Sequence, residues 1–371
     1  MKPKLAIACQ GGGAHAAFTA GVLQTLFEHG IQDHYEIVSV SGTSGGAICA
    51  ALIWYALKKG EQPVWQRLLD FWQDNTAQSA PEQFFNNFAI HTLNLTSKGL
   101  LPQFNVSPAS MLLQNWMSFT TAALGLRSRF TDLRELLSTH ISFPELATWG
   151  AQPEPPILVL GACNILTGKL WMFDSYHQPV QVEHILASCA IPNLFPAVEI
   201  GADAYWDGVF SDNPPITELI NPYYVGNENI PDEIWVIKIN PTGRDSIPVE
   251  PDDILDRRNE LLGNISLFQS LYSVERINDF IIGGAFQPEY LQRYPHLQHP
   301  IKIPKSFVEQ EDKPYHIPFI EMSSALQKSL NYESKLDRNP DRIAQMLLDG
   351  RRQADQFLRQ HLTAETNPTS P

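Results

Sequence analysis

The sequence of 371 residues is poor in cysteine and in clustered positive charge. Its four cysteines, Cys9, Cys49, Cys163 and Cys189, lie far apart and form no C-x-x-C pair, which argues against a zinc site and against a dense disulfide framework. We therefore expect a reducing, cytoplasmic environment. Lys and Arg number 26 against 40 Asp and Glu, a formal net charge of −14, and no basic run exceeds two residues. A chain without a basic stripe is a poor match for nucleic acid, so no such partner is expected.

Long hydrophobic runs are also missing. The apolar run at 5–9 is followed directly by glycines, and it is too short for a signal peptide or a membrane span. Residues 83–126 carry one formal charge, Lys98, but Pro102, Pro108 and several amide side chains interrupt their apolar stretches. No membrane-spanning helix is expected. Transient contact with a membrane surface and export by a non-classical route both stay open.

What is present is a large apolar fraction, 43% of the residues, arranged as alternating strand and helix patterns. Strand, tight turn and helix occur twice in succession at the N-terminus, which is typical of a parallel sheet covered by helices. The pattern predicts strands at 5–9, 36–40, 157–163, 169–173, 233–239 and near 316–321, and helices at 14–27, 47–57, 180–188, 252–282 and 341–358. The helix at 252–282 could also be two helices broken near Gly263.

The first candidate motif is Gly42-Thr43-Ser44-Gly45-Gly46, which fits G-x-S-x-G and lies between a predicted strand and a predicted helix. A nucleophilic serine needs this sharp turn, because the turn projects its hydroxyl above the sheet while small neighbours avoid a clash. The N-terminus of the following helix would face any negative charge that develops there. A glycine-rich turn that serves only packing is the alternative.

The second motif is Gly11-Gly12-Gly13, directly after the first strand. Consecutive glycines leave main-chain N–H groups unobstructed, so the turn could hold an oxyanion or a phosphate. Gly11, Gly13 and Ala16 also fit the dinucleotide pattern G-x-G-x-x-G/A, but that fold needs an acid at the end of the second strand. The second strand ends at Val40-Ser41-Gly42, so the nucleotide-binding reading fails at its most discriminating position.

A nucleophilic serine also needs a base. His296, His299, His316 and His361 are candidates for a Ser/His/Asp triad by chain order only, since none has flanking residues that indicate a rigid site. A carboxylate held against the serine can do the same work. Asp207-Gly208 fits this role, with a carboxylate at a strand end followed by a glycine that permits a turn.

Four blocks in order resemble the patatin-like phospholipase family, of bacterial type, over roughly residues 5–240. They are the glycine block from Gly11 to Leu23, the elbow from Gly42 to Gly46, the segment Ala187-Ser188-Cys189-Ala190-Ile191-Pro192, and Asp207-Gly208 with Asn213-Pro214-Pro215 after it. The resemblance implies a three-layer α/β/α fold with a mostly parallel sheet and a Ser–Asp dyad that uses no metal and no cofactor. Ser44 would be the nucleophile and Asp207 the base. Gly11, Gly12 and Gly13 would supply oxyanion amides, with help from the N–H of Gly45.

Three positions depart from the family pattern. His15 stands where the family usually has a basic residue after the glycines, and Ala16 stands where it has the next glycine. Val209 follows Asp207-Gly208, where the family has glycine or alanine. His15, beside the site like Gly208, is the substantive change, because a side chain that is neutral for much of the time near pH 7 holds an anionic head group less firmly than Arg.

The implied function is hydrolysis of carboxylic esters of lipids, of phospholipase A or lysophospholipase type. An esterase or thioesterase for short-chain or oligomeric esters is the first alternative, and an inactive lipid- or partner-binding module is the second. Head group, acyl position and oligomeric state stay open.

The resemblance also divides the chain. We expect a catalytic domain at 1–240, a mainly helical C-terminal extension at 241–361 packed on the same core, and a disordered tail at 362–371. Within the catalytic domain, the nearly uncharged residues 83–126 form either a lid that contacts lipid or ordinary core.

Overall fold

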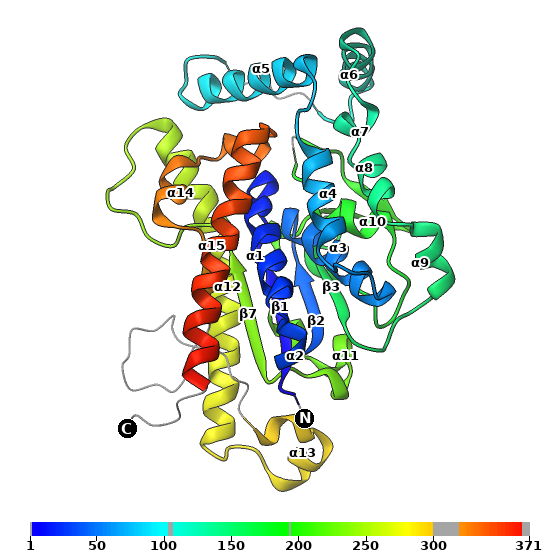
Figure 1. Cartoon of the computed structure of the whole chain (residues 1–371), viewed down its shortest axis with the longest axis vertical. Helices are drawn as coiled ribbons and strands as arrows, with labels where there is room; N and C mark the ends of the chain where they lie inside the picture. The colour runs from blue at the N-terminus through cyan, green and yellow to red at the C-terminus, as the bar shows by residue number, and fades with distance from the viewer. Residues whose placement is uncertain (1, 103–106, 193, 300–318, 366–371) are drawn as a thin grey trace.

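The computed structural model describes residues 2–102, 107–192, 194–299 and 319–365 (Figure 1). Its strands are β1 (Lys4–Cys9), β2 (Glu36–Gly42), β3 (Ile157–Asn164), β4 (Lys169–Asp174), β5 (Val198–Ile200), β6 (Asp203–Asp207), β7 (Glu233–Lys238) and β8 (Phe319–Glu321). Its α-helices are α1 (Ala17–Glu28), α2 (Ile31–His34), α3 (Gly45–Lys59), α4 (Gln66–Asn75), α5 (Ala80–Ser97), α6 (Met111–Leu124), α7 (Ser128–Thr131), α8 (Leu133–His140), α9 (Phe143–Trp149), α10 (Val182–Ser188), α11 (Pro222–Val225), α12 (Pro251–Ile282), α13 (Pro288–Arg293), α14 (Ser324–Ser329) and α15 (Pro340–Glu365). Its 3-10 helices are η1 (Gly13–Ala16), η2 (Gly208–Phe210), η3 (Thr217–Ile220), η4 (Asn227–Asn229), η5 (Pro295–Gln298) and η6 (Glu333–Leu336).

Within the described residues the strands form one mixed sheet in the order β5-β6-β3-β2-β1-β7-β8, with β4 also paired to β3. The run from β3 to β8 is parallel, whereas β4 and β6 pair antiparallel with β3, and β5 pairs antiparallel with β6. The carboxyl ends of the parallel strands share one edge, which is where ligands bind in open α/β sheets.

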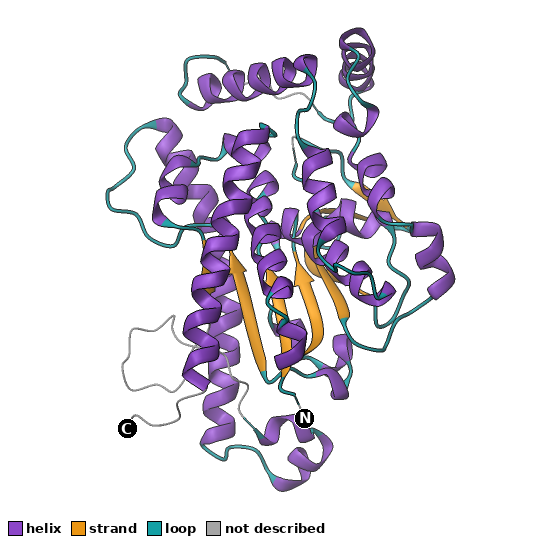
Figure 2. Cartoon of the chain, in the orientation of Figure 1, coloured by secondary structure: helices purple, strands orange, loops and turns teal. Residues whose placement is uncertain are grey.

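Side-chain alternation along the strands explains the layers. In β1, Leu5, Ile7 and Cys9 belong to an apolar cluster that also includes residues of α1, α3 and α15. Ala6 and Ala8 point to the opposite face and belong to a second cluster with residues of α12 and η3. Both faces of the sheet are thus covered by helices, as Figure 2 shows for the near face. This confirms the predicted three-layer α/β/α fold with a mostly parallel sheet and a mainly helical C-terminal region.

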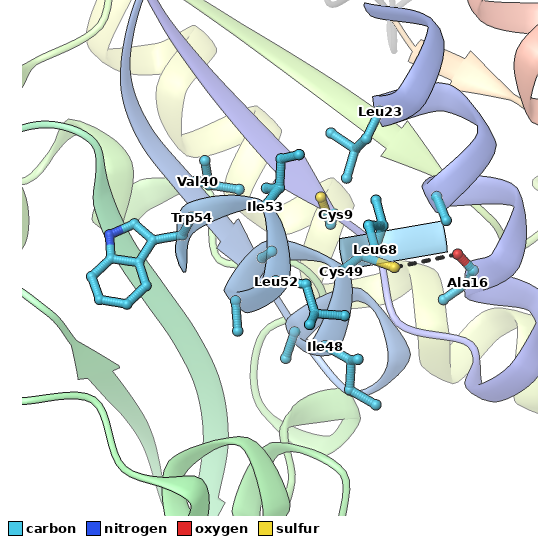
Figure 3. Close-up of a cluster of buried hydrophobic side chains, with 14 of the residues drawn as sticks. Cys9, Ala16, Leu23, Val40, Ile48, Cys49, Leu52, Ile53, Trp54 and Leu68 are labelled. Carbon is cyan, nitrogen blue, oxygen red and sulfur yellow. Dashed lines mark hydrogen bonds between the residues drawn. The ribbon is translucent and has the colours of Figure 1, made fainter. Parts of the chain in front are cut away.

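Helix α3, which follows the serine turn, is buried along most of its length. Its Ala- and Leu-rich sequence suits this position, because small residues let the helix approach the sheet while Ile53 points toward Val40 and Cys9 of the strands (Figure 3). Cys49 donates a hydrogen bond to the carbonyl of Ala16 at 3.4 Å, which joins α3 to η1. Burying each leucine or isoleucine contributes about 1.5–3 kcal/mol, so this packing holds α3 against its neighbours.

Described residues of β8, α14 and α15 belong to the same apolar cluster as residues of β1 and α1. Strand β8 pairs parallel with β7, and α15 packs along α1. The two helices touch through glycines, since a Cβ atom at Gly21 would lie 2.1 Å from the carbonyl oxygen of Leu347, and one at Gly350 would lie 2.2 Å from that of Phe18.

Two expectations for the C-terminal region can be compared with the structure. Helix α12 is one continuous helix through Gly263. Helix α15 runs to Glu365 and so extends into the segment 362–371, for which we predicted a disordered tail; residues 366–371 lie outside the described part of the chain.

Helices α5 and α6, which lie in the weakly charged segment 83–126, expose large apolar side chains. Figure 1 places α5 and α6 at one extremity of the molecule, at the top of the view. Leu112, Trp116 and Phe119 of α6 are 82%, 58% and 72% exposed, and Phe84 and Phe88 of α5 are also exposed. No helix in the described ranges combines the length and apolar character needed to cross a bilayer.

Candidate active site

Ser44 lies in a strained turn between β2 and α3. Its φ of 55° and ψ of −129° make it the only non-glycine residue in the described chain with positive φ. Such strain persists only where the surroundings enforce it, and it is common at reactive positions. The surroundings here leave no room for side chains: a Cβ atom at Gly42 would lie 2.4 Å from the carbonyl oxygen of Gly46, and one at Gly46 would lie 2.2 Å from that of Cys9.

The turn is fastened by Ser188, at the end of α10. The N–H of Ser44 donates to the hydroxyl of Ser188 at 3.0 Å and to its carbonyl at 3.1 Å, and the Ser188 hydroxyl donates to the carbonyl of Gly161 at 2.7 Å. Two residues on, the carbonyl of Ala190 accepts the N–H of Asp207 at 3.0 Å. One short segment therefore holds both predicted reacting residues, a role that the sequence did not assign to it.

Asp207 ends β6 with a fully buried side chain. Its Oδ1 accepts the N–H of Val209 at 2.8 Å. Its Oδ2 is buried and has no hydrogen-bond partner of regular geometry among the described residues, although the hydroxyl of Ser44 is close enough to lower the carboxyl's pKa. Burial raises the pKa of Asp207 to about 7, against the lowering effects of Val209, Ser44 and the charge of Lys335. The structure thus brings together Ser44 and Asp207, which are 163 positions apart in the sequence.

The glycine turn lies beside Ser44, but its amides are not equivalent. The N–H of Gly11 donates to Oδ1 of Asn213 at 2.6 Å, so this amide has a structural partner. The N–H groups of Gly12, Gly13 and Gly45 make no hydrogen bond to any described residue. A Cβ atom at Gly45 would lie 2.4 Å from the carbonyl oxygen of Gly13, so these glycines bring the turn and the start of α3 together.

Gly208 is needed for packing next to the carboxylate. A Cβ atom at this position would lie 2.4 Å from the carbonyl oxygen of Gly161 and 2.9 Å from the Thr43 side chain. The glycine after Asp207 therefore lets β6 approach both β3 and the serine turn.

Ser44 opens into a cavity of about 320 Å³. The lining is mainly apolar, and it includes Gly13, Gly45, Phe85, Ala89, Ile90, Leu93, Met117, Cys189, Ile191, Phe195, Lys335, Leu336 and Arg338. The size and the apolar lining suit a small-molecule or acyl-chain site. Helices α5 and α6 form part of the wall, as a lid would. The contribution of 335–338 was not predicted from the sequence.

His15 does not line the Ser44 cavity. Its Nε2 lies 2.8 Å from the hydroxyl of Ser334, and its ring is buried. Burial keeps the pKa of His15 well below its usual value, and the charges of Lys335 and Arg342 lower it further. The residue at the family's basic position is thus a neutral side chain that holds η6.

Two of the histidines proposed by chain order, His299 and His361, are described, and neither lines the Ser44 cavity. His361 lies 3.3 Å from Glu233 at the start of β7, and His299 is exposed directly after η5. His316 and the side chain of His296 lie outside the described residues. No described histidine lines the Ser44 cavity, and in the described ranges no group of three or more His, Cys, Asp and Glu side chains is arranged to hold a metal ion.

Comparisons with known proteins concern the family of the chain. A search of curated proteins gives no match. Solved structures that resemble the chain include VipD from Legionella pneumophila, at 15% identity and a TM-score of 0.40, with 97% of this chain and 67% of that one covered. ExoU in its heterodimeric complex with SpcU, from the type III secretion system of Pseudomonas aeruginosa, is 17% identical at a TM-score of 0.25, with 80% and 58% covered. The profile of the patatin-like phospholipases matches residues 7–220, more than half of the chain, and the chain therefore belongs to this family of carboxylic ester hydrolases.

Proposed function

We propose that the protein cleaves carboxylic ester bonds of lipids, of phospholipase A or lysophospholipase type, through an acyl-enzyme on Ser44 with Asp207 as the base. The observation that carries the proposal is the buried Oδ2 of Asp207, which lacks another partner among the described residues and belongs to a carboxyl whose pKa responds to the Ser44 hydroxyl. A pKa of about 7 suits a general base that works near neutral pH.

The first half-reaction forms the acyl-enzyme. Asp207 accepts the hydroxyl proton of Ser44 while Oγ attacks the ester carbonyl carbon. The carbonyl oxygen becomes an oxyanion, for which we propose the N–H groups of Gly12, Gly13 and Gly45 as donors, each worth about 3 kcal/mol in other hydrolases. Gly11 is not among the proposed oxyanion donors, because its N–H already donates to Asn213. When the tetrahedral intermediate collapses, the C–O bond to the alcohol breaks and the alcohol takes the proton from Asp207.

The second half-reaction regenerates the enzyme. Asp207 accepts a proton from a water molecule, whose oxygen attacks the acyl carbon. Collapse of this second intermediate breaks the bond to Oγ, which regains the proton, and releases the fatty acid. The same carboxylate serves both halves, so no histidine is needed.

We propose further that α5 and α6 act as a lid that touches the lipid surface. One side of these helices, including Phe85, Ile90 and Met117, lines the Ser44 cavity. Other apolar side chains of the same helices, Phe88, Trp116 and Phe119, are exposed. When the exposed side chains contact lipid, the same helices can move and open the Ser44 cavity to the substrate. Contact would be transient, since the net charge of −14 opposes lasting binding to an anionic bilayer. The scattered, unpaired cysteines favour the cytoplasm as the compartment.

A fluorophosphonate probe tests the dyad. We expect labelling of the wild-type protein, none of Ser44→Ala, and at least a hundredfold slower labelling of Asp207→Asn. Asp203→Asn, at the other end of β6, is the matched control and should label like wild type. Absence of Ser44-dependent labelling would indicate a binding module in place of an enzyme. A panel of phospholipids, lysophospholipids and short-chain esters then identifies the substrate, and turnover of short-chain esters alone would contradict the lipid assignment.

A further inference from the structure

The short helix η6, from the C-terminal region, lies directly against the glycine turn. A Cβ atom at Gly13 would be 2.3 Å from the carbonyl oxygen of Lys335, so only glycine permits this approach. The residue before Lys335 in η6, Ser334, is hydrogen-bonded to His15 of η1. Two adjacent residues of η6 are thus fixed to the block that follows β1, more than 300 positions earlier in the chain.

Lys335 brings a positive charge to this place. Its side chain is half-buried and lines both the Ser44 cavity and a smaller neighbouring cavity that contains His15. Its Nζ donates to Oδ1 of Asn240 at 2.9 Å, and Nδ2 of Asn240 donates to the carbonyl of Gly11 at 3.3 Å. The ammonium group is therefore held to the glycine turn through one neutral side chain.

We propose that Lys335 is a positioning residue of this active site, whose positive charge beside the glycine turn and the Ser44 cavity favours the ionised form of Asp207 that accepts the proton of Ser44. The proposal rests on the proposed function of Ser44 and Asp207. Lys335 acts through Asp207 and not by contact with the reacting atoms.

The charges around the site agree with this role. Lys335 lowers the pKa of Asp207, against burial, and Asp207 in turn raises that of Lys335. Burial lowers the pKa of Lys335 to about 8, while Glu260 and Asp256 of α12 oppose this effect, so the amine is mainly protonated at pH 7.

Other titratable groups around Asp207 do not supply a positive charge. Tyr332 and Cys189 both feel the charge of Asp207, and burial raises the pKa of each, so both are neutral near pH 7. His15 is neutral as well, partly because Lys335 is charged. Lys335 is the remaining cation that lowers the pKa of Asp207 in the described structure.

The test is the pH dependence of fluorophosphonate labelling at Ser44 in the full chain. If Asp207 must be ionised, the labelling rate rises with pH along a limb whose midpoint reports its pKa. For Lys335→Met we expect the midpoint to move up by about 0.5–1 pH unit, which slows labelling about three- to tenfold at pH 6. Lys335→Arg should retain the wild-type midpoint, because it keeps the charge.

Lys328→Met is the matched control. Lys328 lies on α14, is exposed, and pairs with Asp245 at the surface, so its removal changes the net charge equally without touching the site. Its labelling profile should equal that of wild type. If Lys335→Met does not fold, as judged by thermal unfolding, Lys335→Gln takes its place, since an amide can still donate to Asn240.

The outcomes separate the two proposals. The wild-type protein could label at Ser44, while the midpoint of its pH profile stays the same in both neutral Lys335 variants. This result would overturn the role of Lys335 and leave the proposed dyad intact. An equal shift of the midpoint in Lys328→Met would also overturn the role of Lys335, because the change in net charge would then explain the shift. A wild-type protein that does not label removes the dyad, and the role of Lys335 with it.

Discussion

The hydroxyl of Ser188 joins the main chain of Ser44 to strand β3, since it accepts the Ser44 N–H at 3.0 Å and donates to the Gly161 carbonyl at 2.7 Å. This single side chain fixes the height of the serine turn above the sheet. The carbonyl of the same residue also accepts the Ser44 N–H, at 3.1 Å, so the turn has two supports from one residue.

Replacing Ser188 by Ala should therefore loosen the turn without destroying the fold. We expect a loss of about 1–2 kcal/mol in unfolding free energy, as for other buried hydrogen bonds, and labelling of Ser44 slowed by more than the change in stability explains. Urea unfolding and probe kinetics measure the two effects. Ser211→Ala is the control, because Ser211 donates to the neighbouring carbonyl of Ala162 at 2.9 Å but makes no hydrogen bond to Ser44. Equal labelling of the two variants would contradict a positioning role for Ser188.

Gly13→Ala should separate backbone strain from steric conflict. Gly13 and Gly125 have nearly the same positive φ, 56° and 63°, but a Cβ atom at Gly13 meets the carbonyl of Lys335 while one at Gly125 meets open space. Positive φ alone costs alanine about 1 kcal/mol. Gly125→Ala should lose only that amount. Gly13→Ala should lose more unfolding free energy and should also label slowly, because the added methyl group pushes η6 away. Thermal unfolding and probe kinetics measure the two effects. An equal loss of stability in both variants would show that η6 moves aside at no cost.

The exposed side chains of α6 should matter on vesicles and not in solution. The double variant Trp116→Ser/Phe119→Ser should lose most of its activity on phospholipid vesicles and keep its activity on a soluble short-chain ester. Leu166→Ser/Leu170→Ser removes exposed apolar groups around the turn between β3 and β4, and it should match wild type on both substrates. Equal loss of both activities in the α6 variant would reject the lid.

A buried pair of carboxyl groups near the serine turn should make stability depend on pH. Burial and the neighbouring Glu218 raise the pKa of Asp212, and its carbonyl accepts the hydroxyl of Thr43 at 2.6 Å. An acid whose pKa is higher in the folded state stabilises the fold below its unfolded pKa, about 4, and this stabilisation is lost as pH rises through the folded value.

Asp212→Asn removes the titrating group and can keep the contact with Ser270, 3.2 Å from Oδ1. The melting temperature of the variant relative to wild type should therefore be higher at pH 9 than at pH 5. Asp245→Asn, at an exposed position, should show no such difference. A constant offset between Asp212→Asn and wild type at both pH values would contradict the assignment.

The sequence predicts those parts of the molecule whose signals are local. The apolar runs at 5–9 and 36–40 end in glycine turns, and β1 and β2 begin and end within two residues of them. Ser44 is identified by its elbow, and Asp207 by its place at a strand end before glycine. β5, with three residues, is too short to give a periodic pattern.

The rest of the site depends on contacts between distant segments. Nothing near Lys335 marks it as part of an active site, because its position follows from the packing of η6 on Gly13. His15 could be recognised as a departure from the family, but its partner Ser334 lies 319 positions away. Burial, which decides the charge of His15, cannot be read from its neighbours in the sequence.

Gly21 of α1 faces the main chain of Leu347, and Gly350 of α15 faces that of Phe18, so these two glycines join the first and the last α-helix of the described chain. On the ribosome, the chain emerges from its N-terminus, so the elbow and the glycine turn are made long before the helix that covers α1. Until that last helix arrives, Phe18 and Val22 lack part of their cover. We therefore expect the protein to become stable and competent to hydrolyse esters only after α15 has been made and has packed on α1.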